Sequence, residues 1–192
     1  MADTALPVVL VLASGRGERF RASGAAVHKL QALLGGKPVL QHTLAAVRAS
    51  GLPWHLEDAG HPGMGDAIAA AVRATAGAAG WLILPGDLPL VRPETMLMVA
   101  AALAHHEAAV PVFGGRHGHP VGFSAVCVAE LMTLQGEYGA APVRRAHGAH
   151  ELVVDDAGCI TDIDTLEDLS RAEALWRARA AAAGSGPRSR GP

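Results

Sequence analysis

The chain alternates short runs rich in Val, Leu and Ile with longer alanine-rich stretches whose apolar positions repeat at helical spacing. Runs of the first kind are typical of strands buried on both faces, and stretches of the second kind of helices that cover a sheet. Strands are predicted over residues 6–13, 53–57, 81–85, 109–113, 120–124 and 151–155. This alternation predicts an α/β fold with a mostly parallel sheet and helical layers on it.

The helical stretches carry recognisable start and stop signals. Helices are predicted over residues 38–50, 65–78, 93–106 and 165–182. Pro38 and Pro93 occupy the first turn, where proline is favoured, and Gly51 follows the first of these helices. No internal repeat or linker interrupts the chain up to residue 182, so we expect a single domain over 1–182 and a disordered, Gly-, Pro- and Ser-rich tail over 183–192.

Composition narrows the class of protein. The 192 residues are 50% hydrophobic and 18% charged, and 16 Lys and Arg against 18 Asp and Glu give a net charge of -2, so neither a nucleic-acid nor an anionic-membrane partner is expected. The apolar stretch 6–15 lacks a cationic flank before it and is too short to cross a bilayer, which favours a buried strand. Two cysteines without a CxxC pattern and ten scattered histidines indicate a reducing, cytoplasmic location and no zinc site.

The segment LASGRGERF at 12–20 directly follows the first predicted strand. Loops at the carboxyl ends of strands are where α/β proteins usually bind ligands. Gly15 and Gly17 would bring backbone N–H groups close to an anion, and Arg19 and the later Lys29 would supply positive charge. The segment therefore predicts a phosphate-binding loop.

Two common nucleotide-binding patterns are excluded for this loop. No GK[ST] follows, so it is not a Walker A loop, and Phe20 stands where the dinucleotide fingerprint needs its third glycine. The alternative is that Gly15 and Gly17 serve only a tight turn from strand to helix.

A carboxylate lies at a second strand end. The run WLILP leads into GDLPLV at 86–91, which places Asp87 at the edge of the sheet where the glycine loop is expected. Mg²⁺ takes one or two carboxylates together with phosphate oxygens, so Asp87 is a candidate metal ligand. The alternative is that Asp87 only caps a turn.

Taken in order, five motifs resemble the MobA-like nucleotidyltransferases. They are LASGRGERF with a following HKL, GMGDA from Gly63, PGDLPLV at 85–91, GRHGHPVGF at 115–123 and DIDTLEDL at 162–169. Within that superfamily, the GDLPL, GHP and DIDT elements are more similar to the molybdenum cofactor cytidylyltransferases than to the guanylyltransferases.

This resemblance implies a glycosyltransferase-A-like, Rossmann-like three-layer α/β sandwich. It implies an Mg²⁺-dependent enzyme that joins the NMP of an NTP, CTP by the closest motifs, to a phosphorylated acceptor and releases pyrophosphate. Molybdopterin or the molybdenum cofactor is the implied acceptor, with a molybdoenzyme as a possible partner.

The resemblance also implies roles for individual residues. The implied catalytic residues are Arg19, Lys29 and Asp87. The implied nucleotide-binding residues are Leu12, Ala13, Ser14, Gly15, Gly17, Arg19, Lys29, Gly65 and Asp66. Asp87 and Asp162 would bind the metal, and His119 and Pro120 the acceptor.

The sequence departs from the family pattern at Ser14, where the family usually has Ala or Gly, and in two regions, and it leaves several roles open. Residues 21–28 form an insertion before Lys29, and 51–64 is short, with one strand where the family has two. Asp164 is either a cap of the following helix or a metal ligand, and Arg144 lies either near the acceptor or on an exposed helix face. His117 is expected to be solvated.

Other functions remain open at this point. Guanylyl, cytidylyl or uridylyl transfer to a different phosphate acceptor would use the same residues. A nucleotide or cofactor carrier without turnover would keep the same fold, since a fold does not fix a function.

Overall fold

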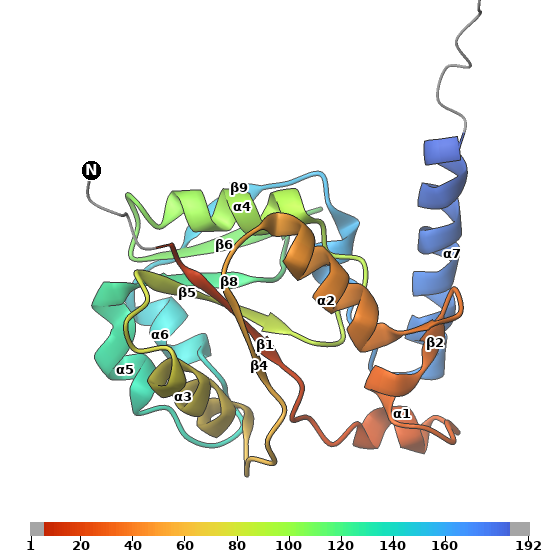
Figure 1. The fold of residues 1–192 in the computed structure, drawn as a ribbon, viewed down its shortest axis with the longest axis horizontal. Coiled ribbons are helices and arrows are strands. Elements are labelled where there is room, and N and C mark those ends of the chain that lie inside the picture. The colour runs from red at the N-terminus through yellow and green to blue at the C-terminus, as the bar shows by residue number, and fades with distance from the viewer. Residues whose placement is uncertain (1–5, 185–192) are drawn as a thin grey trace, which may run out of the picture.

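In the computed structural model, which describes residues 6–184, a seven-stranded sheet forms the centre of the molecule (Figure 1). Its strands are β1 (Val8–Leu12), β4 (Trp54–Glu57), β5 (Gly80–Pro85), β6 (Ala108–Phe113), β7 (Arg116–His117), β8 (Val121–Ser124) and β9 (His150–Val153). The order is β4-β1-β5-β8-β6-β7, and β9 pairs in parallel with β6. Five strands run in one direction and β7 and β8 run against them, so the sheet is mostly parallel, as predicted.

Helices cover both faces of this sheet (Figure 1). On one face lie α2 (Val39–Ser50) and α4 (Pro93–Ala102), and on the other α3 (Met64–Ala74), α5 (Val128–Met132) and α6 (Ala141–Ala146). A short helix, α1 (Glu18–Ala22), and the C-terminal helix α7 (Leu166–Gly184) lie beside the sheet with a small hairpin, β2 (Leu33–Leu34) and β3 (Lys37–Pro38). The predicted three-layer α/β class is confirmed.

Alternating side chains of β1 build the two halves of the core. Val9 and Val11 pack with residues of α2 and α4, whereas Leu10 and Leu12 pack with residues of α3 and α5. Successive side chains of a strand point to opposite faces, so a strand between two helical layers must be apolar at every position. This requirement explains the continuous run VVLVL that made the strand predictable.

The predicted elements are present with small differences at their ends. The third predicted helix ends at Ala102 because residues 103–106 form a turn closed by backbone hydrogen bonds to 100–102, and α3 ends at Ala74 in a similar way. The short strands β2, β3 and β7 and the helices α1, α5 and α6 were not predicted, since two to six residues carry little periodicity. Helix α7 continues to Gly184, and the rest of the expected tail lies outside the described residues.

A third cluster of apolar side chains joins the segments beside the sheet. Its buried members include Phe20 of α1, Leu34 of β2, Ile163 just before α7 and Ala172 within α7. Helix α7 is also fixed by Arg179, whose guanidinium donates to a carboxylate oxygen of the buried Asp156 over 2.9 Å. The predicted phosphate loop and the DIDT segment are thereby held at the same edge of the molecule. No helix within residues 6–184 has the length and apolar character needed to cross a membrane.

Candidate functional site

The glycine loop leaves the carboxyl end of β1 and enters α1. Gly17 is the residue before α1 and adopts a left-handed conformation with φ of 63°, which glycine accepts without strain. Gly15 has no such conformation, and a Cβ built on it meets no atom of residues 6–184 within 4 Å. The first glycine leaves open space beside the backbone, and the second makes the turn.

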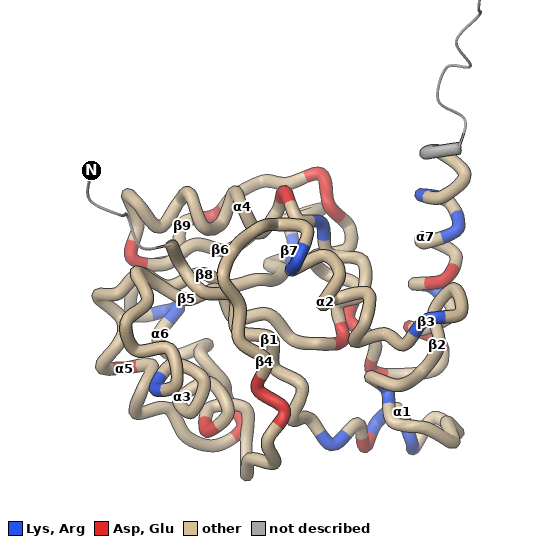
Figure 2. The backbone as a smooth tube through the Cα atoms, viewed as in Figure 1, with Lys and Arg blue, Asp and Glu red and all other residues tan. Residues whose placement is uncertain are grey.

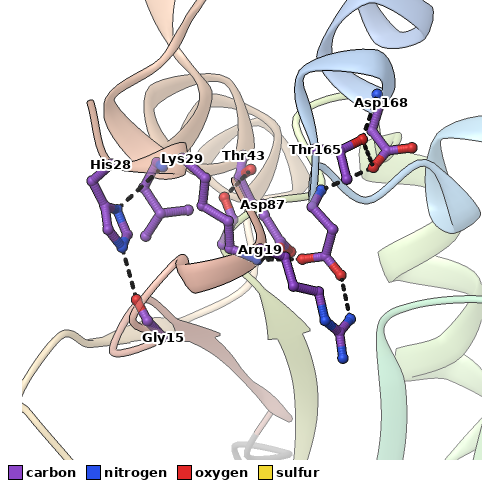
Figure 3. Close-up of polar contacts among 11 residues, drawn as sticks. Gly15, Arg19, His28, Lys29, Thr43, Asp87, Thr165 and Asp168 are labelled. Atoms are coloured by element: carbon purple, nitrogen blue, oxygen red, sulfur yellow. Dashed lines mark hydrogen bonds and ion pairs between the residues drawn. The ribbon is translucent and has the colours of Figure 1, made fainter. Parts of the chain in front are cut away.

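The inserted segment 21–28 folds back onto this loop (Figure 3). The Nδ1 of His28 accepts a hydrogen bond from the backbone N–H of Leu30 over 3.3 Å, so its Nε2 carries the proton and donates to the carbonyl of Gly15 over 2.8 Å. Ser23, in the same insertion, accepts from the backbone N–H of Leu166 over 3.1 Å. The insertion therefore connects the glycine loop to the start of α7.

Backbone hydrogen bonds place Asp87 beside the glycine loop. The N–H of Gly86 donates to Leu12 over 2.9 Å, and the N–H of Ile163 donates to the carbonyl of Asp87 over 3.1 Å. The hydroxyl of Thr43, fully buried in α2, donates to the carbonyl of Gly86 over 2.9 Å (Figure 3). The sequence analysis missed Thr43, whose only signal is a hydroxyl on the otherwise apolar face of a helix.

Lys29 lies between two carboxylates at the centre of this arrangement (Figure 3). Its Nζ is 2.6 Å from Oδ2 of Asp87 and 2.7 Å from Oδ1 of Asp164, and Arg19 donates to Oδ2 of Asp164 over 2.9 Å. Burial lowers the pKa of Lys29, but the two aspartates outweigh burial and raise it, so the amine stays protonated. Hydrogen bonds from Lys29 and Arg19 likewise outweigh burial and lower the pKa of Asp164.

The side chain of Asp164 contacts Lys29 and Arg19 and does not serve as the cap of α7 in the described structure, and its role as a metal ligand stays a prediction. Thr165 and Asp168 cap α7: the N–H of Asp168 donates to Oγ1 of Thr165 over 3.2 Å, and Oγ1 donates to Oδ2 of Asp168 over 2.7 Å. The carboxylate of Asp164 is therefore free to meet Lys29. Asp162 is exposed, and burial of part of its carboxyl together with Asp87 and Asp164 raises its pKa.

A cavity of about 430 Å³ opens between the glycine loop and the start of α3. It is lined by residues from the glycine loop, the segment from Lys29, the end of β5, the start of α3 and the segments before α3, α6 and α7, among them Leu12, Ser14, Gly15, Gly17, Arg19, Lys29, His61, Gly63, Met64, Asp87, Glu137 and Asp164. Most of the residues predicted to bind a nucleotide are thus in one place.

Gly65 and Asp66 make a different contact from the one expected. The N–H of Gly65 donates to the carbonyl of Gly136 over 2.7 Å, and Asp66 accepts from the N–H of Gly136 over 2.9 Å. Their neighbours Gly63 and Met64 line the cavity instead. The nucleotide-binding role of Gly65 and Asp66 stays a prediction, and the structure gives both residues a part in holding the loop around Gly136.

A second cavity, of about 290 Å³, adjoins the first, and Met64 and Pro85 line both. His119 lines the second cavity, Pro120 is buried after it, and burial lowers the pKa of His119. Nδ1 of His119 is buried without a hydrogen-bond partner among the described residues.

The same cavity bears on two further residues. Arg144, which the sequence left open, lines it, so this arginine is not part of a plain exposed helix face. His117 also lines it and is exposed to solvent, as expected; its Nδ1 is 2.6 Å from Arg144 and its Nε2 is 2.6 Å from the carboxylate of Glu151. Its ring thus connects the cation of the cavity wall to a strand of the sheet.

Comparison with known proteins gives a family and several relatives. A model of the MobA-like NTP transferase domain family matches residues 45–152. The bifunctional protein GlmU of Desulfitobacterium hafniense is 27% identical over 138 residues, which are 61% of this chain and 30% of that protein. GlmU of Xanthobacter autotrophicus is 32% identical over 175 residues, 76% of this chain and 38% of the relative. The chain thus spans about a third of the length of these curated relatives.

Solved structures share the fold. Rv0371c from Mycobacterium tuberculosis superimposes with a TM-score of 0.74 at 23% identity, covering 88% of this chain and 97% of that one. A nucleotidyl transferase from Methanothermobacter gives 0.73 at 20% identity, covering 91% and 99%. Molybdopterin-guanine dinucleotide biosynthesis protein A from Archaeoglobus fulgidus gives 0.57 at 18% identity, covering 89% and 99%. Rv0371c has also been solved in complex with manganese.

Proposed function

The chain belongs to the MobA-like NTP transferase domain family, and from this premise we propose that it is a nucleotidyltransferase that transfers the NMP of CTP to molybdopterin or its molybdenum-loaded form. The predicted family and the enzyme class that it implies are confirmed. The observation that carries the proposal is Lys29, protonated beside the glycine loop and in contact with both Asp87 and Asp164. A lysine cation next to a glycine loop with uncrowded backbone N–H groups, at the end of a strand, is suited to binding a triphosphate.

The nucleotide and the acceptor rest on motif similarity. The GDLPL, GHP and DIDT elements are similar to those of the cytidylyltransferases, and one structural neighbour is a molybdopterin-guanine dinucleotide biosynthesis protein A. A molybdoenzyme that receives the product is the proposed partner. We place the enzyme in the cytoplasm, because Cys127 and Cys159 are buried and free, which suits a reducing compartment.

The proposed reaction needs two anions held in line and no covalent enzyme intermediate. An oxygen of the acceptor phosphate forms a bond to the α-phosphorus, and the bond from that phosphorus to the bridging oxygen breaks with its electron pair going to pyrophosphate. Lys29 and Arg19 would bind the β- and γ-phosphates and neutralise the charge that develops there. The backbone N–H groups around Gly15 would fix the same phosphates.

The carboxylates present suit a magnesium ion. Oδ1 of Asp87 is buried and has no hydrogen-bond partner among the described residues, so one of its oxygens is available to a cation. Burial of part of the Asp162 carboxyl, together with the negative charge of Asp87 and Asp164, raises its pKa, and a cation would offset that negative charge. Asp87 and Asp162 would hold Mg²⁺ through oxygen atoms, which this ion prefers. The bound ion would supply positive charge to the phosphate oxygens.

We place the acceptor in the second cavity. His119 and Arg144 line this cavity. Met64 and Pro85 line both cavities, so an acceptor bound here would lie next to the nucleotide. Arg144 is suited to the acceptor phosphate because a guanidinium presents paired donors to phosphate oxygens. Pro120 would contribute by shaping the turn that carries His119.

Pyrophosphate release tests this proposal. The full chain is incubated with Mg²⁺ and CTP, GTP, UTP or ATP, with and without purified molybdenum cofactor. We expect release that needs both CTP and the cofactor, and a fall of roughly 100-fold or more in Asp87→Asn. Asp155→Asn is the matched control, since Asp155 is an exposed aspartate away from the site. Nucleotide binding without release under every acceptor would overturn the proposal in favour of a carrier.

A further inference from the structure

The nucleotide cavity has two chemically different ends. Arg19 and Lys29 line the end next to the glycine loop, whereas His61 and Glu137 line the end next to α3, where the described lining includes no Lys or Arg. Figure 2 shows Lys and Arg gathered around α1, with an acidic residue among them, and an acidic segment at the end of β4. Glu18, Asp87 and Asp164 also line the end next to the glycine loop, so that end carries both signs of charge. It is the end that holds Arg19 and Lys29, so we place the triphosphate there. The nucleoside therefore extends toward His61.

A buried carboxylate holds His61 in place. Glu57 ends β4, directly beside the last residue of β1, and its carbonyl accepts from the N–H of Ala13 in the glycine loop over 2.8 Å. Its side chain is only 10% exposed, and Oε1 lies 3.0 Å from Nε2 of His61. Burial alone would raise the pKa of Glu57, but hydrogen bonds from His61, Ala59 and His55 outweigh it and lower the pKa, so the group is ionised.

The ionised carboxylate fixes the tautomer of the ring. A carboxylate accepts hydrogen bonds only, so Nε2 of His61 carries the proton and, in the neutral imidazole, Nδ1 is an acceptor. Nδ1 has no hydrogen bond within the described part of the chain. Glu137, the charged residue at the same end, is also an acceptor. This end of the cavity therefore offers acceptors to a base.

We propose that Glu57 and His61 form the pair that reads the nucleobase: Glu57 orients His61, and Nδ1 of His61 accepts a hydrogen bond from the exocyclic amino group of the base. Cytosine carries this donor at N4 and adenine at N6, whereas uracil and guanine present a carbonyl oxygen at the corresponding position. The inference rests on the proposed nucleotidyl transfer and gives its preference for CTP over UTP a physical cause. His61 here determines specificity, and Glu57 is a positioning residue.

A purely structural explanation exists and makes a different prediction. Glu57 also accepts from the N–H of Ala59 over 3.3 Å, so it could serve only to brace the turn between β4 and α3. Loss of a brace would weaken binding of every nucleotide alike. Loss of base recognition would instead change the ratio of the affinities for two nucleotides that differ in one exocyclic group.

The test is the affinity of the full chain for CTP, UTP, ATP and GTP in the presence of Mg²⁺ and without acceptor, measured by calorimetry. Wild type should bind CTP about tenfold more tightly than UTP. This is the size expected if CTP forms one hydrogen bond to Nδ1 of His61 where UTP would place a second acceptor against it. Glu57→Gln keeps the shape but its amide can donate to Nε2, which leaves Nδ1 of His61 protonated. This variant should lose the preference or reverse it toward UTP, and His61→Ala should lose it.

His55→Gln is the matched control. His55 also contacts Glu57, with Nε2 3.5 Å from Oε2, but it does not line the cavity, so this variant should keep the wild-type ratio. Unchanged ratios in Glu57→Gln and His61→Ala, or a wild type that binds UTP as tightly as CTP, would overturn the inference and leave the transferase standing. A wild type that binds no NTP would overturn the proposed function together with the inference. Thermal unfolding of each variant identifies any loss of the fold.

Discussion

Nε2 of His28 donates a hydrogen bond to the carbonyl oxygen of Gly15 over 2.8 Å, so a residue of the inserted segment holds the loop that we expect to bind phosphate. A loop fixed before its ligand arrives loses less conformational freedom on binding. The insertion 21–28, which departs from the family pattern, thereby supports the glycine loop and leaves Lys29 within reach of Asp87.

Removal of this imidazole should weaken nucleotide binding. We expect His28→Ala to lower the affinity for the NTP about tenfold and stability by about 1 kcal/mol, through loss of two hydrogen bonds. His42→Ala is the control, because His42 donates in the same way to the carbonyl of Leu34 over 2.7 Å, away from the site. Calorimetric titration with CTP and thermal unfolding measure both effects. Equal losses of affinity in the two variants would contradict the role given to His28.

The two glycines of the loop should respond differently to alanine. An added Cβ at Gly15 meets no atom of residues 6–184 within 4 Å, so we expect Gly15→Ala to fold with unchanged stability and to bind the NTP more weakly. At Gly17, the left-handed φ of 63° disfavours alanine, and an added Cβ would lie 3.0 Å from Nε2 of His28. We therefore expect Gly17→Ala to lower the free energy of unfolding by about 1 kcal/mol or more. Thermal unfolding and NTP titration separate these effects. Wild-type affinity in Gly15→Ala would show that the phosphates do not approach this backbone.

Asp164 and Asp168 lie four residues apart and should have separable roles. Asp164→Asn removes the negative charge that faces Lys29 and Arg19, so we expect turnover to fall about tenfold or more with the fold intact. Asp168→Ala removes the carboxylate that accepts from Oγ1 of Thr165 and from the N–H of Asp164 at the start of α7, and we expect about 1 kcal/mol less stability with turnover unchanged. Steady-state kinetics and chemical denaturation measure both quantities. A larger loss of turnover in Asp168→Ala would reverse the assignment.

Stability should depend on pH through His147. Its Nδ1 is 2.7 Å from Oε2 of Glu107, and its Nε2 is 2.6 Å from Oε1 of Glu130. Both hydrogen bonds raise the pKa of His147 above 6.5, and the one to Glu107 has the larger effect. A raised pKa in the folded state gives stability that is complete below the unfolded-state pKa and is lost as pH rises through the folded-state pKa. Because both glutamates are about half exposed, the contribution should be about 1 kcal/mol at most.

The measurement compares the free energy of unfolding of wild type and His147→Gln. We expect wild type to be the more stable at about pH 6 and the difference to shrink by about pH 9. His105→Gln is the control, since the side chain of His105 is exposed and makes no hydrogen bond or ion pair among residues 6–184. A difference that grows with pH would contradict the assignment.

The longer strands and helices, and the residues that we expect to bind phosphate, could be predicted from the amino-acid sequence. Apolar runs such as 8–12 fixed the strands, because a strand buried on both faces has to be apolar throughout. Gly15, Lys29 and Asp87 could be found in sequence because they stand at strand ends or in a recognisable motif, and the structure brings them into one cavity.

Contacts between side chains that lie far apart in the chain could not be predicted in this way. The choice of Asp164 as the partner of Lys29 depends on contact across 135 positions, and the contact between Lys29 and Asp87 spans 58. Local periodicity reports on a few turns of chain and says nothing of such distances. Glu57 and His61 lie close in sequence and are hydrogen-bonded to each other. The position of His61 at one end of the nucleotide cavity nevertheless depends on the pairing of β4 with β1, because that pairing sets the Glu57 carboxylate beside the glycine loop.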